Sequence, residues 1–469
     1  MSVIEDLQGI AGSAHVLTGE AAAPYAKDWT GQYESAPLCV VKPASTEEVS
    51  AVMRAASAAK RPVVASAGRT GLTGATHAPE AIVLSLERMN RIREIRPEAR
   101  VAIVDSGVIL AQLREAADAA GLVFPLTFGA QGSARIGGVL STNAGGSNVL
   151  RYGNTRALCL GLEVVLADGR VLDLMSALAK DNSGYDLRDL FIGAEGTLGI
   201  ITGAVMRLHT RPLAYVSAMI ALHDLGDGLA LLNRLQAETG GAVEAFEYMP
   251  RSYMEAWQAH VPDGRQPFDD IHDHAVFLEL GVTARRDATV DENGTLPAQA
   301  HLEEILGEMI SDGTVLDAVI AQNGQQRREM WARRELAGEL MTAYGPVVLG
   351  DVSVPLDQVA PFLEDTRAAL AEAAPGSREA VVSHLGDGNV HYAVWPSDGL
   401  NGHAQAMEII ESTAVRHGGS FSAEHGVGLT KRPAMARHKD PVALEVMRVL
   451  KSALDPGNIL NPGKVLPGN

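Results

Sequence analysis

The chain has 469 residues, which is more than one ordinary hydrophobic core accommodates, so we expect two or more domains. Hydrophobic residues make up 46% and charged residues 20%, as in a globular protein rather than a disordered or fibrous one. The 39 Lys and Arg against 57 Asp and Glu give a net charge of −18, which argues against nucleic acid or an anionic membrane surface as a partner. An anionic substrate would therefore need positive groups gathered locally.

The cysteines and the N-terminal region indicate a reducing compartment. Cys39 and Cys159 lie far apart and form neither a disulfide framework nor a CxxC metal site, so we interpret them as buried thiols. Residues 1–19 are acidic and mixed, without the basic region and apolar core of a signal peptide. No apolar run reaches the roughly 20 residues of a membrane span. We expect a cytoplasmic protein without a transmembrane segment.

A glycine-rich loop follows a helix and a short strand in the first part of the chain. Ser45 caps the predicted helix, and residues 62–65 predict a buried strand. Gly68, Gly71 and Gly74 then let the backbone approach a ligand closely and point N–H groups at an anion such as a diphosphate. An ordinary glycine-rich turn explains this stretch equally well, because it is neither a Walker motif nor a GxGxxG fingerprint.

A second glycine-rich stretch, residues 125–146, carries six glycines and almost no charge. Small polar residues such as Ser133 and Asn143 lie between the glycines. The stretch is too apolar for a long solvated loop, so we expect a buried wall that lies against a large planar cofactor. Residues 189–202 form a further compact glycine-rich stretch that ends in a strand.

The second half of the chain changes in composition after Leu213. Strands such as 214–222 and 274–280 alternate with helices such as 298–310, which predicts a separate substrate domain of sheet and helices. Residues 325–341 predict a charged helix with four arginines. A solvated face fits most of these arginines, and one of them can point inward as the partner of a carboxylate.

Two short predicted strands flank Asp387-Gly388, and Asp-Gly is a strong signal for a two-residue hairpin of type I′. That turn would place His384 directly opposite His391, with Cβ atoms about 4.5–5.5 Å apart. Two such imidazoles can share a divalent metal, and Glu424 can supply a carboxylate while coordination positions stay open. Two chance histidines are the plainer interpretation, but their placement across Asp-Gly favours the metal. On its own, the motif would equally suit a metal-dependent hydrolase.

The glycine-rich first half resembles the FAD-binding domain of vanillyl-alcohol-oxidase-type flavoproteins through four stretches in chain order, which are 68–71, 129–146, 152–153 and 193–199. The second half resembles the C-terminal domain of the FAD-linked 2-hydroxy-acid dehydrogenases. That group contains D-lactate dehydrogenases, the glycolate oxidase catalytic subunit and D-2-hydroxyglutarate dehydrogenase. The two resemblances together cover nearly the whole chain. The matching pieces of the second half are residues 331–335, 351–355, 383–391, 423–428 and 461–464.

The resemblance implies an α+β fold in three segments. Residues 1–212 would form a two-part FAD-binding domain of vanillyl-alcohol-oxidase type. Residues 213–420 would form an α+β substrate (cap) domain with an antiparallel sheet and the metal-binding hairpin, and residues 421–469 would return to the FAD domain. A homodimer is common in the family.

The resemblance also implies FAD as the cofactor. The loop 67–71 would hold its pyrophosphate, while the wall 129–146 and the region 196–201 would line its flavin and adenosine parts. Some members of the family attach FAD covalently to a histidine in or near the first loop. His77 lies several residues beyond that loop here, so we expect non-covalent FAD. The residues expected to contact FAD are Ala67, Gly68, Arg69, Thr70, Gly71, Pro125, Gly132, Ser133, Gly137, Gly138, Ser141, Thr142, Asn143, Gly145, Gly196, Ile201 and Asn461.

The second resemblance implies the roles of the residues around a 2-hydroxy-acid substrate. A divalent metal, zinc in the first place and manganese as the alternative, would chelate the substrate, and the C2 hydrogen would leave as a hydride to flavin N5. A histidine base would take the proton of the hydroxyl. The implied residues are His384, His391 and Glu424 as metal ligands, His384 also beside the substrate, His425 as the base, Arg334 on the substrate carboxylate and Asn389 as a further substrate contact.

Two positions depart from the D-2-hydroxyglutarate dehydrogenases of the family. In those enzymes, a threonine four residues after the arginine and a lysine just before the Asp-x-Ser-x-Pro element hold the distal carboxylate. Gly338 and Leu349 stand at these positions here. A second carboxylate left unpaired would cost about 1–3 kcal/mol. The departure favours a monocarboxylate such as D-lactate, or an acid with an apolar tail, and leaves D-2-hydroxyglutarate dehydrogenase and a glycolate oxidase subunit as alternatives.

Two other classes of protein fit the sequence less well. A metal-dependent hydrolase leaves the glycine-rich first half unexplained. A non-catalytic flavin-binding subunit would not need His384, His391, Glu424 and His425, which are all intact. The electron acceptor stays open among quinone, cytochrome, electron-transfer flavoprotein and oxygen.

Overall fold

The computed structural model describes residues 2–292, 294–343 and 345–468. Helices alternate with sheets of mixed and antiparallel type, which confirms the predicted α+β class. The chain divides into two compact units. The first unit comprises the chain up to Gly145, Tyr152–Thr210 and the chain from Glu424 on, and the second unit comprises Gly146–Arg151 and Arg211–Ala423.

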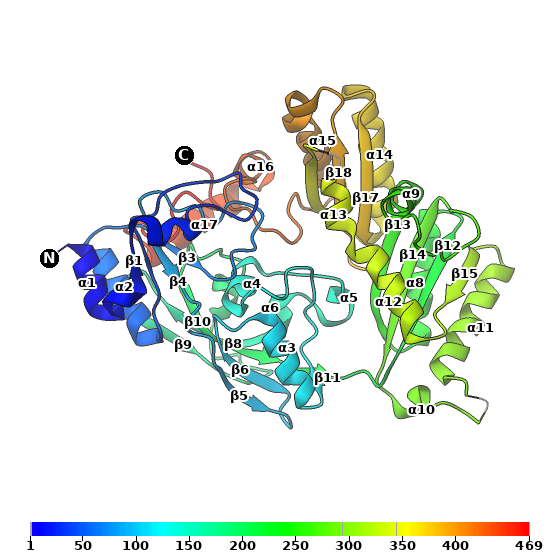
Figure 1. The fold of residues 1–469 in the computed structure, drawn as a ribbon, viewed down its shortest axis with the longest axis horizontal. Coiled ribbons are helices and arrows are strands. Elements are labelled where there is room, and N and C mark those ends of the chain that lie inside the picture. Colours follow the sequence, from blue (N-terminus) through cyan, green and yellow to red (C-terminus); the bar gives the residue numbers. More distant parts are fainter. Residues whose placement is uncertain (1, 293, 344, 469) are drawn as a thin grey trace. The chain divides into compact units, whose positions relative to one another are not determined.

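The first unit begins with a four-stranded sheet, in the order β1 (Val16–Leu17), β2 (Cys39–Val41), β4 (Ile82–Ser85) and β3 (Val63–Ser66). Figure 1 labels β1, β4 and β3 of this sheet. Strands β2, β4 and β3 are parallel, because helix α2 (Thr46–Ala58) carries the chain across from β2 to β3. Ser45 caps α2 through its side chain, as the sequence predicted. Val49, Val52 and Met53 bury the inner side of this helix.

A five-stranded sheet follows in the first unit, in the order β5 (Ile92–Arg96), β6 (Val101–Asp105), β10 (Ile200–Arg207), β8 (Cys159–Val165) and β9 (Val171–Leu174). All its neighbouring strands are antiparallel. Helices α3 (Leu110–Ala119), α4 (Ile136–Thr142) and α6 (Thr155–Leu158) pack apolar side chains on it. The predicted wall therefore contains a helix, α4. Gly137 lets that helix approach the end of β6, since a Cβ there would lie 2.8 Å from the Cβ of Ser106.

The second unit is built on one seven-stranded sheet, in the order β15 (Val315–Ile320), β12 (Ala214–Leu222), β14 (His274–Val282), β13 (Val243–Pro250), β17 (Arg378–His384), β18 (Asn389–Trp395) and β16 (Val348–Ser353). Every neighbouring pair of strands is antiparallel. The predicted strands 214–222 and 274–280 are confirmed as β12 and β14.

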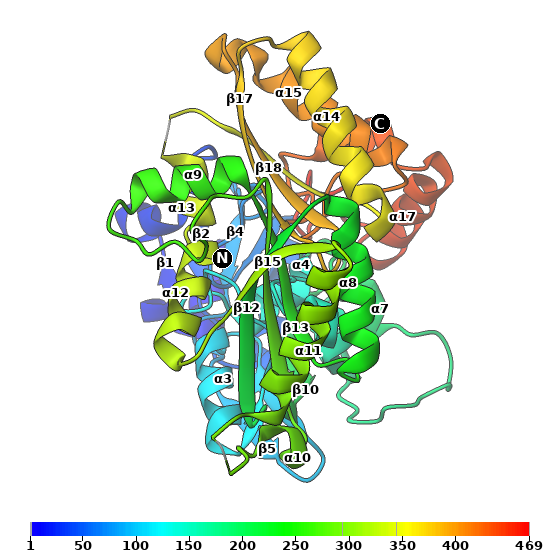
Figure 2. The same ribbon diagram turned by 90° about the vertical axis from the view of Figure 1, so that its right-hand side faces the viewer.

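Helices cover both faces of this sheet. Helices α8 (Leu225–Glu238), α11 (Pro297–Ser311), α14 (Val359–Ala373) and α15 (His403–Arg416) pack on one face, and α9 (Arg251–His260), α12 (Gly324–Glu335) and α13 (Ala337–Thr342) pack on the other. Figure 2 shows α8 and α11 beside strands β12 and β13. We call the face covered by α9, α12 and α13 the α12 face.

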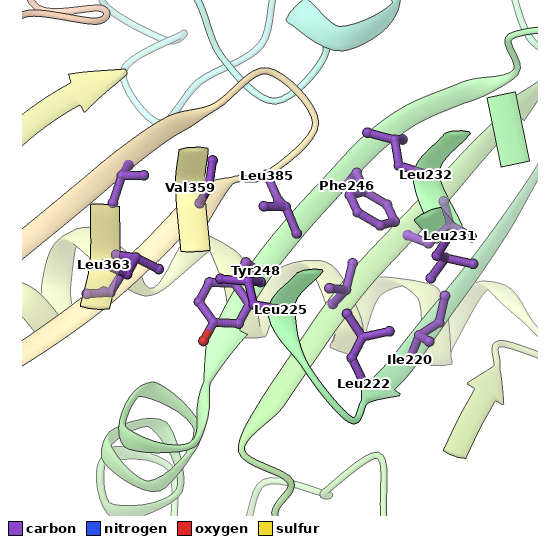
Figure 3. Close-up of a cluster of buried hydrophobic side chains, with 14 of the residues drawn as sticks. Ile220, Leu222, Leu225, Leu231, Leu232, Phe246, Tyr248, Val359, Leu363 and Leu385 are labelled. Atoms are coloured by element: carbon purple, nitrogen blue, oxygen red, sulfur yellow. The ribbon is translucent and has the colours of Figure 1, made fainter. Parts of the chain in front are cut away.

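Side chains alternate between the two faces along each strand. On β13, Phe246 and Tyr248 enter the apolar cluster that also contains Leu225 and Val359 (Figure 3). Glu247 lies between them and therefore points to the α12 face. A carboxylate in the middle of a fully buried strand must find partners on that side, and it leads to the candidate site.

Among the described residues, no helix is both long enough and apolar enough to cross a membrane. The remaining elements are further helices and two short strands. They are the helices α1 (Val3–Ala11), α5 (Val149–Tyr152), α7 (Arg188–Phe191), α10 (Arg285–Ala288), α16 (Arg432–His438) and α17 (Pro441–Leu454), the strands β7 (Leu122–Val123) and β11 (His209–Thr210), and the 3-10 helices Ser13–His15, Gly19–Tyr25, Leu356–Gln358 and Gly399–Gly402.

Candidate active site

The hairpin between β17 and β18 differs from its prediction. A four-residue loop, 385–388, joins the strands instead of a two-residue turn, so His384 pairs with Asn389 rather than with His391. The turn closes at Gly388, which has a φ of +78° and donates its backbone N–H to the carbonyl oxygen of His384 at 3.1 Å. The predicted direct pairing of the two histidines is therefore wrong.

The two histidines nevertheless project from the same face. His391 lies opposite Val382, and His384 lies two residues further along the same strand, so both imidazoles point to the α12 face. Their ring centroids are 5.3 Å apart, with the ring planes at 79°. The side chains are 9% and 19% exposed. Diagonal neighbours on a sheet can thus still direct two imidazole nitrogens at one ligand.

A carboxylate missed by the sequence analysis lies against His384. Glu247 is 0% exposed and pairs with His384 across β13 and β17. Its Oε1 lies 2.9 Å from Nδ1 of His384. Burial alone would raise the pKa of Glu247, but the nearby His384 and Arg334 outweigh it and hold that pKa below its ordinary value. Because an ionised carboxylate only accepts hydrogen bonds, Nδ1 of His384 is the donor in this pair.

Arg334 reaches the same carboxylate from helix α12. Its Nε donates to Oε2 of Glu247 at 2.7 Å, and its Nη2 lies 3.4 Å from Nε2 of His384. The side chain is buried. The prediction that one arginine of this helix points inward is thus correct, and the guanidinium and the imidazole are directed to one place.

The other arginines of α12 are less solvated than predicted. Arg327 donates two bonds of 2.6 Å to the buried Glu279 on β14. Arg333 is buried and stacks over the ring of Trp257 at 4.3 Å. Of the four arginines, only Arg328 is exposed. The prediction of a mainly solvated face fails because the helix packs on strands that carry buried carboxylates, which sequence spacing does not reveal.

A second carboxylate, Asp351 on β16, lies beside His391 and Asn389. Its Oδ1 is 4.0 Å from Nδ1 of His391 and accepts a 3.1 Å bond from Nδ2 of Asn389. Asn389 also donates to the carbonyl oxygen of Val352. Within the described part of the chain, Oδ1 of Asn389 is buried and has no hydrogen-bond donor. Because buried polar atoms are normally satisfied, this oxygen can accept a hydrogen bond from a water molecule or a bound group.

Glu424 and His425 begin the last segment of the first unit. They directly follow Ala423, whose backbone N–H donates to the carbonyl oxygen of Asp351 at 3.3 Å. One residue before Glu424, the chain is therefore held at β16, the strand that carries Asp351. Covalent geometry limits how far Glu424 can lie from this point, since consecutive Cα atoms are about 3.8 Å apart.

The turn after His425 is anchored by a buried carboxylate within the first unit. Glu195 accepts hydrogen bonds from the backbone N–H groups of Val427 at 2.7 Å and Gly428 at 2.9 Å. Burial raises the pKa of Glu195, and the two N–H donors oppose that rise. Glu195 has a φ of +51°, in the left-handed region that residues other than glycine rarely adopt. Glu195 lies within the predicted glycine-rich stretch 189–202.

The predicted pyrophosphate loop lies against the predicted wall in the first unit. A Cβ at Gly68 would lie 2.4 Å from the carbonyl oxygen of Ser133, so only glycine allows this approach of two backbones. Arg69 has a φ of +55°. Among the described residues, the backbone N–H groups of 68–71 have no protein acceptor. A run of such N–H groups with a left-handed residue is suited to an anion such as a diphosphate.

Asn461 brings the C-terminal segment to the same region of the first unit. Its Nδ2 donates to the carbonyl oxygens of Ala75 at 3.1 Å and Glu195 at 2.8 Å. Its Oδ1 is buried and finds no donor in the part of the chain that the structure describes. An acceptor without a partner and a loop of backbone N–H groups without acceptors, both in the first unit, fit a cofactor that offers ring N–H groups and a diphosphate.

The other residues predicted to contact FAD also belong to the first unit. Ser141 and Thr142 donate their hydroxyls to carbonyl oxygens one turn earlier in α4. Asn143 ends that helix in the left-handed region. Gly196, with a φ of +70°, lies near Ala65 of β3. The others are Ala67, Thr70, Pro125, Gly132, Gly138, Gly145 and Ile201.

Comparison with known proteins connects both halves of the chain to flavoproteins. The family model described as "FAD binding domain" matches residues 37–175, and the model described as "FAD linked oxidases, C-terminal domain" matches residues 211–465. A D-2-hydroxyglutarate dehydrogenase of Stutzerimonas stutzeri is 35% identical over 99% of this chain and 98% of its own. Another of the same name, from Xanthomonas citri pv. viticola, is 38% identical over 94% of this chain and 92% of its own.

Solved structures share the fold at lower sequence identity. The structure of p-cresol methylhydroxylase with substrate bound has a TM-score of 0.73 and 17% identity, and the match covers 98% of this chain and 96% of that one. Such a likeness establishes a common fold of vanillyl-alcohol-oxidase type and nothing about the reaction.

Proposed function

The chain belongs to the family of FAD-linked oxidases and dehydrogenases, and we propose that it oxidises a D-2-hydroxy acid to the 2-oxo acid with FAD as the electron acceptor. The observation that carries the proposal is a cluster of polar side chains on the α12 face. It contains the imidazoles of His384 and His391, the guanidinium of Arg334 and the amide oxygen of Asn389, which accepts no hydrogen bond within the described part of the chain. A hydroxyl and a carboxylate on adjacent carbon atoms are what such a set recognises.

FAD would be held without a covalent bond by the first unit. The N–H groups of loop 67–71 would receive its diphosphate, and the wall around α4 and Asn461 would line its rings. When bound, FAD supplies the two-electron acceptor that takes the C2 hydrogen of the substrate as a hydride.

A divalent metal would be held by His384, His391 and Glu424, with zinc favoured and manganese as the alternative. Two features support this. Each histidine has a carboxylate neighbour, Glu247 or Asp351, which is a common arrangement around metal-bound imidazoles. The chain before Glu424 is held at β16, the strand that carries Asp351. Such an ion supplies Lewis-acid polarisation of the α-hydroxyl.

The chain's own side chains would do the remaining work. Arg334 would bind the substrate carboxylate. Asn389 would contact the substrate through Oδ1, for which the described residues supply no hydrogen-bond donor. His425 would accept the hydroxyl proton on an imidazole nitrogen as C2 loses its hydrogen. His384 would orient the hydroxyl.

The substrate proposed here is a monocarboxylate such as D-lactate, or an acid with an apolar tail. Leu349 supports this choice. It lies on the α12 face two residues before Asp351, pairs with Ala393 and is 44% exposed. Gly338 leaves open space where a side chain would lie. D-2-hydroxyglutarate is the second candidate, because the relatives with high coverage carry that substrate in their names.

Anaerobic bleaching of the bound flavin tests both the proposed reaction class and the proposed substrate. We expect D-lactate or a D-2-hydroxy acid with an apolar tail to reduce the flavin faster than D-2-hydroxyglutarate, and the L-enantiomers to leave it oxidised. The double variant Gly338→Thr/Leu349→Lys should shift the preference toward D-2-hydroxyglutarate by roughly tenfold or more, since each tenfold corresponds to about 1.4 kcal/mol. Metal analysis of the same sample identifies the ion.

The possible outcomes distinguish an error in the substrate from an error in the reaction class. Faster reduction of the wild-type flavin by D-2-hydroxyglutarate would overturn the substrate choice and leave the reaction class standing. A flavin that no 2-hydroxy acid reduces would overturn the reaction class itself.

A further inference from the structure

Glu247 connects two groups that the proposed function uses for different parts of the substrate. Its Oε2 accepts from Nε of Arg334 at 2.7 Å, and its Oε1 accepts from Nδ1 of His384 at 2.9 Å. The carboxylate is 0% exposed, so these contacts replace all of its hydration.

We propose that Glu247 is a positioning residue, which holds the imidazole of His384 and the guanidinium of Arg334 at a set separation. The inference rests on the proposed function, in which His384 serves the metal and the hydroxyl while Arg334 serves the carboxylate. A 2-hydroxy acid carries these two groups on adjacent carbon atoms. One rigid carboxylate between the two side chains therefore matches the short spacing that the substrate needs.

The first half of this role concerns the tautomer of His384. Glu247 accepts a hydrogen bond from Nδ1 and keeps the ring from rotating, so in the neutral imidazole the lone pair that a metal needs lies on Nε2. A carboxylate on the far side of the ring also makes the imidazole a stronger ligand. Loss of the carboxylate should thus weaken metal binding even if the fold is unchanged.

The second half concerns Arg334. The bond to Glu247 occupies Nε, and Nη2 lies 3.4 Å from Nε2 of His384, so the terminal edge of the guanidinium is held beside the imidazole. A planar guanidinium that is held by one edge offers its other edge to a second carboxylate. Loss of Glu247 should therefore weaken substrate binding more than it slows the chemical step.

The neighbouring strand offers a matched control in Glu279. This carboxylate also lies on the α12 face and is 2% exposed. Arg327 and Trp331 of helix α12 donate to it, as does Ser217. Glu279 thus fastens the same helix to the same sheet, but among the described residues no histidine bonds to it. A defect that arises only from loosening of α12 should appear in both glutamate variants.

Isothermal titration of Zn²⁺ into chelator-treated, FAD-containing protein measures the first effect. In Glu247→Gln, the amide has one acceptor and one donor group, so either His384 or Arg334 faces an N–H instead of an oxygen. We expect Zn²⁺ affinity to fall by roughly 10–100-fold and the KM of the 2-hydroxy acid to rise more than kcat falls. Glu279→Gln should keep its Zn²⁺ affinity within about twofold of the wild type.

Unchanged Zn²⁺ affinity in Glu247→Gln would overturn the inference, and so would equal losses in the two glutamine variants. If Glu247→Gln fails to retain FAD or to melt cooperatively, Glu247→Asp takes its place. That variant keeps the charge but draws the oxygens back by one methylene, and a wild-type affinity for Zn²⁺ would again overturn the inference. Wild-type protein that neither binds Zn²⁺ nor is reduced by any 2-hydroxy acid would instead remove the proposed function, and the inference with it.

Discussion

At the scale of single residues, His425 makes the sharpest prediction. His425→Ala should lower kcat by roughly 10²–10⁴-fold, because the hydroxyl proton loses its acceptor. The flavin should stay bound, since the predicted FAD contacts do not include this side chain. Turnover with a D-2-hydroxy acid and the visible flavin spectrum of the same preparation measure the two effects. A near-normal kcat would exclude His425 as the base.

Sequence could predict the histidines of the site but not the carboxylates that hold them. His384 and His391 are seven positions apart and belong to one hairpin, so a local rule finds them. Glu247 lies 137 positions from His384, and Glu195 lies 232 positions from Val427. Such pairs form only when distant strands or segments meet. A local sign was the presence of two glutamates, Glu244 and Glu247, in the otherwise apolar run 243–250, which an alternating pattern leaves unexplained.

At the scale of elements, the loop of the hairpin shows why a local turn rule failed. Asp-Gly favours a two-residue turn, but the backbone N–H of Val354 donates to the carbonyl oxygen of Gly388 at 3.0 Å. The end of β16 thus holds the loop in its longer form. The strands on both sides were still predictable, because each contains a short run of strand-forming residues, such as Val381-Val382 and Tyr392–Trp395, beside the turn residues.

The same contact makes Gly388 intolerant of a side chain. A Cβ there would lie 2.1 Å from the carbonyl oxygen of Val354, at a φ of +78°. We expect Gly388→Ala to lower the free energy of unfolding by about 1–3 kcal/mol and to weaken Zn²⁺ binding. Gly307→Ala, in helix α11 with open space around its Cβ, should leave stability unchanged or raise it by up to about 1 kcal/mol. Urea unfolding distinguishes the two variants, and equal stability of Gly388→Ala and wild type would contradict the prediction.

At the scale of the whole molecule, the first unit is assembled from segments that are far apart in the chain. The backbone N–H of Val63 donates to the carbonyl oxygen of Ile459 at 2.7 Å, and the N–H of Asn461 donates back to Val63 at 2.8 Å. The C-terminal segment therefore extends the sheet next to β3, the strand that leads into the predicted pyrophosphate loop. Hydrophobic periodicity carries no sign of this closure, and only the resemblance to a family implied that the C-terminus returns.

That closure also buries a lysine, and its titration offers a test. Lys464 donates to the carbonyl oxygen of His77 at 2.7 Å, and burial, with a smaller contribution from Arg432, lowers the pKa of Lys464 from 10.5 to about 8. Between these two values the unfolded chain binds more protons than the folded one, so the free energy of unfolding should rise with pH across that window. Lys464→Met should flatten this part of the profile. Melting temperatures between pH 7.5 and 10 measure it, and parallel profiles for the two proteins would show that Lys464 does not titrate there.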